Sequence, residues 1–308
     1  MLSLLILFSV YISIFLLGMF MLKAGLYALS GHRLKKWLLH FTKTPFQGFL
    51  TGTALTALLQ SSSAMMIITV GLVTTGYLTF RQSIGIILGS NIGSTITTEI
   101  ITLDLGASAI PMLLTGAFFV FFLRHRISYS IGMILIGLAC LFFAMKGFGD
   151  LAKPLASYPV VYEWLKKTDR SNLLGIAVGM LLASIIQSSA ATIGITMGFL
   201  HEHLLTLPAG IAILLGANIG TCVTALLASI GTSQEAKLTA YTHLWLNIAG
   251  VGIFFFLIHP LASFAGSLAA KPDVQLAHVS VLFNVLCSVA ALPFTRFIEA
   301  CITFIHKK

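Results

Sequence analysis

Charged side chains are scarce in this sequence. Asp, Glu, Lys and Arg make up only 9% of the 308 residues, whereas 57% of the residues are hydrophobic. A soluble globular domain has roughly a quarter of its residues charged, so this chain has too few charges to cover a surface that faces water. The composition excludes an ordinary soluble protein and predicts an all-α protein that crosses the membrane several times.

Acidic residues are the scarcest of these charges. The chain has 9 Asp and Glu against 18 Lys and Arg, which gives a formal net charge of +9. A basic chain can bind nucleic acid, but here the basic residues gather in short segments between apolar runs. This distribution is typical of the positive-inside bias of membrane proteins. We therefore expect a multi-pass protein of the plasma membrane with no nucleic acid partner.

Cysteine is also rare. The four cysteines, Cys140, Cys222, Cys287 and Cys301, lie inside apolar runs and form no C-x-x-C pair. This pattern argues against a disulfide framework and against a zinc site, and a role as small core residues is expected. We expect no cofactor.

The N-terminal segment, residues 1–44, combines an apolar run with a basic stretch. Residues 1–22 are apolar and long enough to span a membrane, which takes about 20 residues. A signal peptide would require basic residues before the run, and none is present. We therefore expect an uncleaved transmembrane helix. Residues 31–44 are basic and contain Trp37. They are expected to lie at the cytoplasmic interface, with a plain loop as the alternative.

The most informative feature of the chain is an internal duplication. Gln60-Ser61-Ser62-Ser63-Ala64 recurs as Gln187-Ser188-Ser189-Ala190-Ala191, and Gly89-Ser90-Asn91-Ile92-Gly93 recurs as Gly216-Ala217-Asn218-Ile219-Gly220. Both motifs recur after 127 positions, because 187 − 60 = 127 and 218 − 91 = 127. We therefore divide the chain into the N-terminal segment, a first repeat (45–147), a polar linker (148–171) and a second repeat (172–308).

Each Gln-Ser-Ser motif lies between two apolar runs that are too short to span. In the first repeat the runs cover residues 45–59 and 64–73, whereas a spanning helix needs about 20 residues. We predict a re-entrant helical hairpin in each repeat, with the polar tip at membrane depth, where irregular backbone must be buried or line a wet cavity. One long helix, whose serines bond its own carbonyls, is the alternative. The presence of two copies favours the interrupted form, which is typical of transporter binding sites.

The Gly-Ser-Asn-Ile-Gly motif predicts a second interruption, a broken helix in each repeat. Two glycines around an Asn permit an unwound turn, and the amides that begin the next half-helix would carry partial positive charge. Three crossings, at 83–103, 109–123 and 128–147, would then separate the two hairpins. An odd number gives the repeats inverted topology, with a binding site between them. The linker would then be extracellular although it is rich in Lys, which conflicts with the positive-inside bias.

The polar groups of these motifs suit ions. Hydroxyls, carboxamides and free carbonyls are hard oxygen ligands for Na⁺, whereas unpaired amides at helix N-termini suit an oxyanion. No Lys or Arg stands beside any of the four motifs in the sequence. We therefore expect neutral donors to hold the anion and co-bound cations to offset its charge.

The paired motifs carry a family resemblance. Twin Q-S-S-[SA] motifs, each followed at a fixed spacing by G-[SA]-N-I-G-[ST], resemble the bacterial branch of the type II sodium–phosphate cotransporters, and the resemblance extends from about Pro45 onward. It implies sodium-coupled symport of inorganic phosphate by alternating access. The implied substrate and sodium site consists of Gln60, Ser61, Ser62, Ser63, Gln187, Ser188 and Ser189, with Asn91, Thr95, Asn218 and Thr221 near it. The resemblance assigns Na⁺ to Gln60, Ser61, Gln187 and Ser188.

The chain departs from this family pattern in three places. His243-Leu244-Trp245-Leu246-Asn247 is similar to the family's H-x-x-F-N pattern, with Leu246 in place of Phe. A second copy has Ser280 in place of His. Ala190 replaces the third serine of the second Gln-Ser-Ser motif, which puts the number of bound sodium ions in question.

Glu99 is the one acid well inside an expected membrane segment, where a charge is costly and usually functional. It could bind a cation or carry a proton, or it could lie at the interface near Asp104. His243 and His278 lie in or near apolar runs, and packed, hydrogen-bonded histidines are the expected reading.

Several functions are compatible with these observations. The leading hypothesis is a sodium–phosphate symporter, with inorganic phosphate, Na⁺ and the lipid bilayer as partners and a homodimer left open. The alternatives are a sodium- or proton-coupled transporter of another small anion, such as sulfate or an organic anion, and an anion channel or receptor. An intramembrane hydrolase would need a Ser beside His243. No nucleophile–base arrangement or nucleotide-binding loop is visible, so we do not expect an enzyme.

Overall fold

The computed structural model describes residues 1–30, 37–38, 40–103, 105–123 and 125–306, and this part of the chain is helical and contains no strand. Five of its helices are long and apolar enough to cross a membrane: Leu2–Leu29, Arg126–Ala156, Leu207–Ala228, Gln234–Phe255 and Pro272–Ile305. The chain is thus an all-α membrane protein. Half of the basic segment expected at 31–44, namely residues 31–36 and 39, lies outside the described residues.

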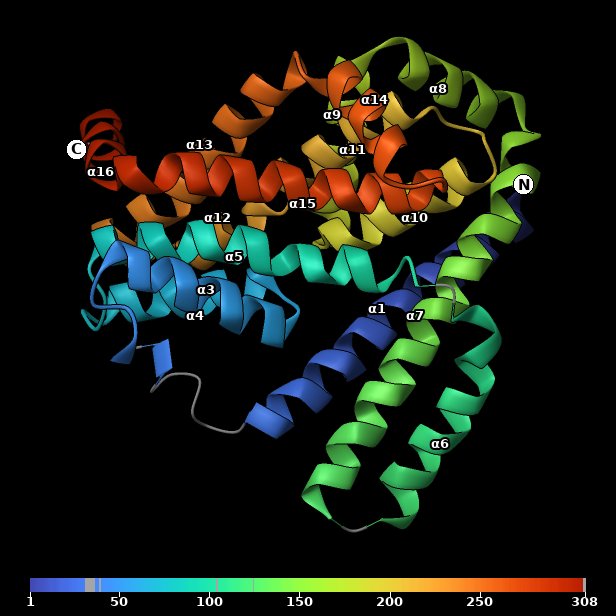
Figure 1. Ribbon diagram of the computed structural model, residues 1–308, viewed down its shortest axis with the longest axis horizontal. Helices are drawn as coiled ribbons and strands as arrows, with labels where there is room; N and C mark the ends of the chain where they lie inside the picture. The colour runs from blue at the N-terminus through green and yellow to red at the C-terminus, as the bar shows by residue number, and fades with distance from the viewer. Residues whose placement is uncertain (31–36, 39, 104, 124, 307–308) are drawn as a thin grey trace.

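Three helices form an arm at the lower right of Figure 1: α1 (Leu2–Ser30), α6 (Ala109–Phe122) and α7 (Arg126–Ala156). Glycines hold α1 close against α7. A Cβ atom at Gly18 would lie 2.8 Å from the Gly137 carbonyl oxygen, and one at Gly25 would lie 2.7 Å from that of Ser130. Small residues let helices approach this closely in membrane proteins. The register and rotation of α1 on α7 are therefore fixed.

The segment between the repeats, which we expected to be a polar linker, is mostly helical. α7 continues to Ala156, beyond the expected end at 147, with Pro154 inside its last turn. An amphipathic helix, α8 (Pro159–Arg170), then leads directly to the second repeat. The acidic and basic residues expected in the linker lie on these two helices, so most of residues 148–171 have regular structure.

The first repeat begins with α3 (Pro45–Leu59), α4 (Ser62–Thr74) and α5 (Phe80–Ile100). The second begins in the same way with α9 (Asn172–Ile186), α10 (Ser189–His201) and α11 (Leu207–Gly220). Helix capping follows the duplication. Thr44 and Ser171 cap α3 and α9, and Thr79 and Thr206 cap α5 and α11, each by accepting a backbone N–H near the start of the helix. Capping residues of this kind fix where a helix starts.

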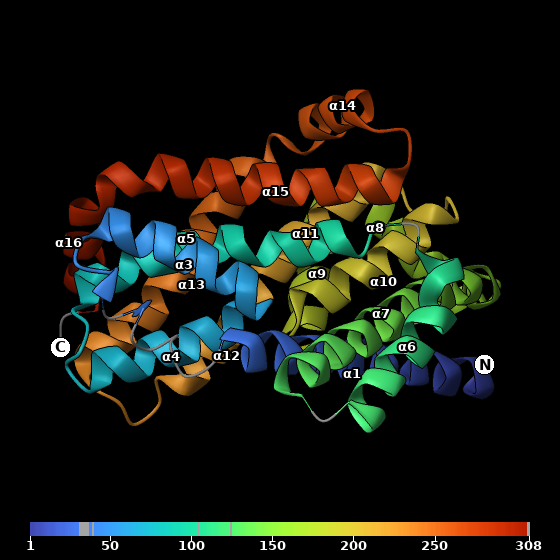
Figure 2. The same cartoon turned by 60° about the horizontal axis from the view of Figure 1, so that its bottom comes forward.

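The rest of the second repeat comprises α12 (Cys222–Ala228), α13 (Gln234–Phe255), α14 (Ile258–Leu268), α15 (Pro272–Ala291) and α16 (Thr295–Ile305). Short 3₁₀ turns, η1 (Gly106–Ser108) and η2 (Leu292–Phe294), precede α6 and α16. The apolar runs at 240–258 and 276–297 also predict membrane helices, and the structure places α13 and α15 there with shifted ends. Figure 2 shows α15 lying along α5 and α11. The short helix α14 was not expected.

The predicted interruption at Gly89-Ser90-Asn91-Ile92-Gly93 is wrong, because α5 runs unbroken from Phe80 to Ile100. Its glycines serve close packing. A Cβ atom at Gly89 would lie 2.0 Å from the Phe49 carbonyl oxygen of α3, and one at Gly93 would lie 2.5 Å from that of Thr53. In the second repeat, α11 also includes Asn218 and ends at Gly220. Only Thr221 separates α11 from α12, so the motif is helical there too.

A large apolar core joins the two halves. Phe15 of α1, Phe148 of α7 and Phe283 of α15 are its largest fully buried side chains. Many large apolar side chains are exposed instead, such as Phe121, Phe256 and Phe304. Exposed apolar residues in this number are expected of a surface that faces lipid.

Candidate functional site

Each Gln-Ser-Ser motif forms a sharp turn between two helices. α3 ends at Gln60, whose backbone is left-handed at φ 51° and ψ 34°, and α9 ends at Gln187 with φ 55° and ψ 31°. His203 is the other non-glycine residue with a positive φ in the described part of the chain. The left-handed conformation costs an ordinary residue about 1–2 kcal/mol. The same strained turn at both motifs shows that the two repeats fold alike here.

The serine after each glutamine begins the next helix. Ser61 caps α4 and accepts the Ala64 N–H at 3.2 Å, and Ser188 caps α10 and accepts the Ala191 N–H at 3.2 Å. The two amides between each capping serine and the residue that donates to it have no acceptor one helical turn earlier. A helix N-terminus of this kind attracts negative charge. Each tip therefore offers amide donors together with serine hydroxyls.

The two tips meet around one small cavity of about 30 Å³. In both ribbon views the first hairpin, α3 and α4, lies to the left of the second, α9 and α10 (Figures 1 and 2). The motifs are 127 positions apart in the chain, yet their polar side chains line the same space. The described residues that line it are Met19, Lys23, Gln60, Ser61, Ser62, Ser63, Ser94, Thr97, Gln187, Ser188, Ser189, Ala190 and Thr221.

The two glutamines differ in how firmly they are held. Gln60 is only 5% exposed, and its Oε1 accepts the Thr97 hydroxyl at 2.7 Å, while its Nε2 donates to the Ala57 carbonyl. Gln187 is exposed, and no described residue bonds its carboxamide. The Gln60 carboxamide is thus fixed by α5, whereas that of Gln187 is free to turn.

Of the four further residues expected near the site, one lies at the cavity and three do not. Thr221 lines the cavity. Asn91 lines a separate, largely apolar cavity with Asn247 and Asn284. Thr95 and Asn218 bond back to their own helices, to the carbonyls of Ile92 and Leu214. Of the eleven expected site residues, the structure therefore brings together the seven Gln and Ser side chains and Thr221, and not Asn91, Thr95 or Asn218.

The sequence analysis missed four lining residues, Met19, Lys23, Ser94 and Thr97, two of which bear on the chemistry of the site. Thr97 holds Gln60, and its position in the repeat register, opposite Thr224, was a usable signal. Lys23 of α1 is the second, and it is the one ionisable side chain among the described residues that line the cavity. No Lys or Arg stands beside the motifs in the sequence, but α1 brings Lys23 to the cavity that they line. The only signal in the sequence was a lysine inside an otherwise apolar segment.

Glu99 lies outside this cavity but has a partner. Its Oε1 is 3.0 Å from Nδ1 of His278, which joins α5 to α15, and both side chains are 34% exposed. His278 was expected to be packed and hydrogen-bonded, and Glu99 provides its hydrogen-bond partner.

His243 is 4% exposed, and its Nδ1 has no hydrogen-bond partner among the described residues. No serine hydroxyl of the described residues bonds that nitrogen, so this atom of His243 does not act as the base of a Ser–His pair in this structure.

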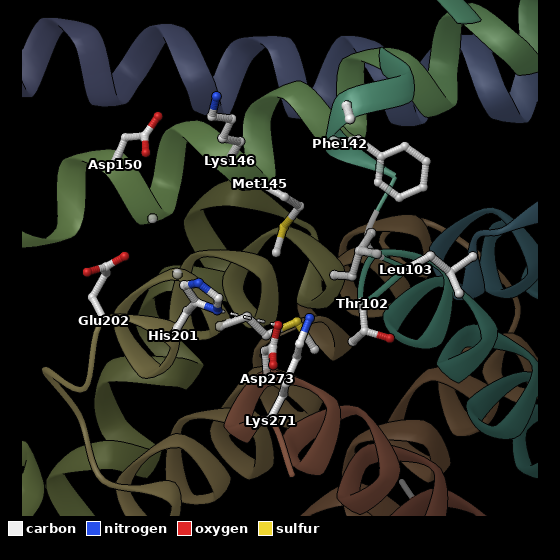
Figure 3. A pocket seen from close by; sticks show the side chains of 16 residues that line it. Thr102, Leu103, Phe142, Met145, Lys146, Asp150, His201, Glu202, Lys271 and Asp273 are labelled. Carbon is white, nitrogen blue, oxygen red and sulfur yellow. Dashed lines mark ion pairs between the residues drawn. The ribbon is translucent and has the colours of Figure 1, made fainter. Parts of the chain in front are cut away.

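A larger cavity of about 500 Å³ lies near the junction of α7, α10 and α15 and contains none of the expected site residues. Figure 3 shows charged side chains of both signs around it, and Nδ1 of His201 lies 3.9 Å from a carboxylate oxygen of Asp273. Lys153 bonds Glu202 at its edge and holds the pKa of that carboxyl below its ordinary value. The opposite charges largely compensate one another, unlike the single positive charge between the tips.

Comparison with known proteins gives the family. The model of the Na⁺/Pi-cotransporter family matches residues 14–150 and 155–270, which include both hairpins and both tips. The chain belongs to the Na⁺/Pi-cotransporter family. No solved structure matches the chain.

Curated relatives extend this result. The chain is 37% identical over 292 residues to "Uncharacterized protein YqeW" of Bacillus subtilis (strain 168), covering 95% of each. It is 24% identical over 277 residues to "Putative inorganic phosphate export protein YjbB" of Escherichia coli (strain K12), covering 90% of this chain but only 51% of YjbB. It is 30% identical over 125 residues to "Sodium-dependent phosphate transport protein 2C" of Rattus norvegicus, covering 38% of this chain and 20% of that protein. The chain thus spans about half the length of YjbB.

Proposed function

We propose that this protein is a secondary active transporter that couples Na⁺ to the movement of inorganic phosphate across the plasma membrane by alternating access. Membership of the Na⁺/Pi-cotransporter family supports the substrate class. The observation that carries the proposal is the meeting of both Gln-Ser-Ser tips at one cavity. Such a site, made of helix ends and neutral oxygen ligands, suits an oxyanion and Na⁺ together. It performs no covalent chemistry, and the protein is not an enzyme.

The site residues follow from the lining of the cavity. Phosphate would accept hydrogen bonds from the serines and helix-start amides of both tips, at residues 61–63 and 188–189, and from Thr221. Na⁺ would be coordinated by oxygens of Gln60, Ser61, Gln187 and Ser188. Asn91, Thr95 and Asn218 would act through the helices that carry them, because their side chains do not line this cavity.

The two repeats have inverted topology in this proposal, with each hairpin re-entering from its own side of the membrane. The matching caps, the matching left-handed turns and the meeting of the tips support it. Single cysteines at Thr44 and Ser171, which begin the two hairpins, should then react with an impermeant thiol reagent from opposite sides. Labelling of both from the same side would contradict the inversion.

Glu99 is proposed as a coupling residue. It pairs with His278 between α5 and α15, and titratable pairs inside membrane segments are often proton relays. A proton gradient would then contribute to transport even when the Na⁺ gradient is the main driving force.

Two other functions remain as alternatives within the same site. A different small anion, such as sulfate or an organic anion, could replace phosphate without any change in mechanism. A channel or receptor would bind the anion without concentrating it. The word "export" in the printed name of YjbB also raises the question of direction.

The deciding experiment is radiolabelled phosphate transport in proteoliposomes. We expect phosphate to accumulate above equilibrium when an inward Na⁺ gradient is imposed and not when Na⁺ is equal on both sides. Efflux from preloaded vesicles tests export. A pH gradient in place of the Na⁺ gradient tests the role of Glu99. Competition by arsenate but not by sulfate tests whether phosphate is the substrate. Equilibration without accumulation under any gradient would identify a channel and contradict the proposal.

A further inference from the structure

The cavity between the tips is not electrically neutral. Lys23 of α1 is the one ionisable group among its described lining residues, and no acidic side chain among them compensates its charge. No described residue forms an ion pair or hydrogen bond with Lys23. The residue lies within the candidate span Leu2–Leu29, where an unpaired ammonium is costly to keep. A ligand that carries negative charge would balance it.

The packing of α1 aims Lys23 at the tips. Gly18, Leu22 and Gly25 face α7, since a Cβ atom at Gly137 of α7 would lie 2.5 Å from the Leu22 nitrogen. Met19 and Lys23 lie one helical turn apart and about a third of the way around α1 from that face. Both line the cavity. Because the glycine contacts prevent α1 from rotating, the position of Lys23 beside the tips is a fixed feature of the fold.

We propose that Lys23 is an anion-binding residue, which supplies the fixed positive charge that holds an oxyanion between the two Gln-Ser-Ser tips. This inference rests on the proposed function and deepens it. Every other anion ligand at the site is a neutral donor: serine hydroxyls and the amides at the starts of α4 and α10. Among the described residues of the lining, Lys23 adds the one full charge. A phosphate dianion bound to Lys23 and to one Na⁺ would leave the occupied site neutral, and Na⁺ would bind well only together with the anion.

The charge of Lys23 can be tested by comparing neutral and charged substitutions. We expect Lys23→Met and Lys23→Gln to weaken phosphate binding by about 30-fold or more, because each removes the charge that faces a desolvated anion. Lys23→Arg keeps the charge and should bind phosphate within about 3-fold of the unchanged protein. Affinity is measured in detergent with radiolabelled phosphate at saturating Na⁺. Rescue by Arg separates a role of the charge from a role in packing.

Lys146→Met is the matched control. Lys146 also lies in a candidate span, Arg126–Ala156, but it lines the larger cavity near α10 and not the cavity between the tips. Its replacement should leave phosphate affinity unchanged. Unaltered phosphate affinity in Lys23→Met or Lys23→Gln would overturn the inference while the transport function stands. Absence of phosphate binding by the unchanged protein would overturn the proposed function and this inference with it.

A second measurement needs no variant and so does not depend on how a mutant folds. Acetic anhydride acetylates lysines, and mass spectrometry follows each site separately. Saturating inorganic phosphate with Na⁺ should slow acetylation of Lys23 several-fold and leave that of Lys146 unchanged. An equal rate at Lys23 with and without phosphate would show that the anion does not contact this side chain and would overturn the inference.

Discussion

The two tip glutamines occupy equivalent positions but different surroundings. Both have left-handed backbones, yet Gln60 is buried and bonded to Thr97, whereas Gln187 is exposed and has no described partner. Replacing a buried, bonded side chain leaves its partner unsatisfied, which costs about 1–3 kcal/mol. Replacing an exposed one costs little stability. The duplicated motif gives no reason for the two replacements to differ, whereas the structure predicts unequal effects on stability.

We therefore expect Gln60→Ala and Gln187→Ala both to abolish phosphate uptake, since each removes a carboxamide from the shared site. They should differ in stability. Gln60→Ala should lower the free energy of unfolding by about 1–3 kcal/mol, because the Thr97 hydroxyl loses its acceptor, and Gln187→Ala should change it by about 0.5 kcal/mol or less. Thermal unfolding in detergent gives the stability, and proteoliposome uptake at matched protein amounts gives the activity.

Thr97→Val provides the control for this difference. It removes the hydroxyl that Gln60 accepts and nearly keeps the side-chain shape, so it should destabilise the protein in the same direction as Gln60→Ala. The double variant should cost less than the sum of the two single changes, because both remove the same bond. Near-normal uptake by either glutamine variant would contradict the site itself, whatever the stability values.

At the scale of single elements, α5 depends on its glycines for contact with α3. Gly85, Gly89 and Gly93 recur once per turn, and a Cβ atom at any of them would lie within 2.5 Å of an α3 carbonyl oxygen. In the second repeat, Gly216 and Gly220 of α11 approach Ile176 and Met180 of α9 in the same way. The glycine spacing therefore aligns each hairpin with the helix behind it and so sets where its tip lies.

Gly89→Ala should consequently be among the most harmful small changes in the chain. Its methyl group would lie 2.0 Å from the Phe49 carbonyl oxygen, and such overpacking costs about 1–3 kcal/mol or more. Gly71→Ala in α4 is the matched control, because nothing lies within 4 Å of its Cβ position. Alanine is the better helix former by about 1 kcal/mol, so this change should be neutral or stabilising. The melting temperatures of the two variants measure this difference in stability.

The same comparison tests how closely α5 packs against α3. If Gly89 did not touch α3, the methyl group of Gly89→Ala would meet no α3 backbone and the change would cost little stability. A Gly89→Ala protein as stable as Gly71→Ala would thus contradict the close contact between α5 and α3.

Sequence reasoning succeeded where the sequence itself decided between the readings of a pattern, and it failed where the decision depends on how helices pack. Low charge and long apolar runs permit little other than membrane helices, and α1 and α7 are present where expected. Polar tips between short apolar runs had only one alternative, and α3 and α9 do end at the glutamines. Glycines beside Asn91 could either unwind a helix or pack it, and only the position of α3 decides between the two. Lys23 could not be assigned, because its place in the site depends on how α1 packs against α7.

At the scale of the whole molecule, the small volume of the cavity between the tips limits what can bind there. About 30 Å³ holds roughly one or two water molecules, which is too little for phosphate with Na⁺. On the proposed function, the hairpins would have to move apart to admit phosphate with Na⁺. Alternating access gives a reason for this movement, since one repeat rocks against the other around the site.

Linking the tips should consequently stop transport. Ser63 and Ala190 occupy equivalent places in the two repeats, and both line the cavity. In a background where the four native cysteines are replaced, Ser63→Cys with Ala190→Cys should transport phosphate while reduced. A short, reducible thiol cross-linker should abolish uptake, and a reductant should restore it. Each single variant should be insensitive to the reagent. Undiminished uptake, in protein whose linked peptides are verified by mass spectrometry, would mean that the tips stay together through the cycle and that substrate does not pass between them.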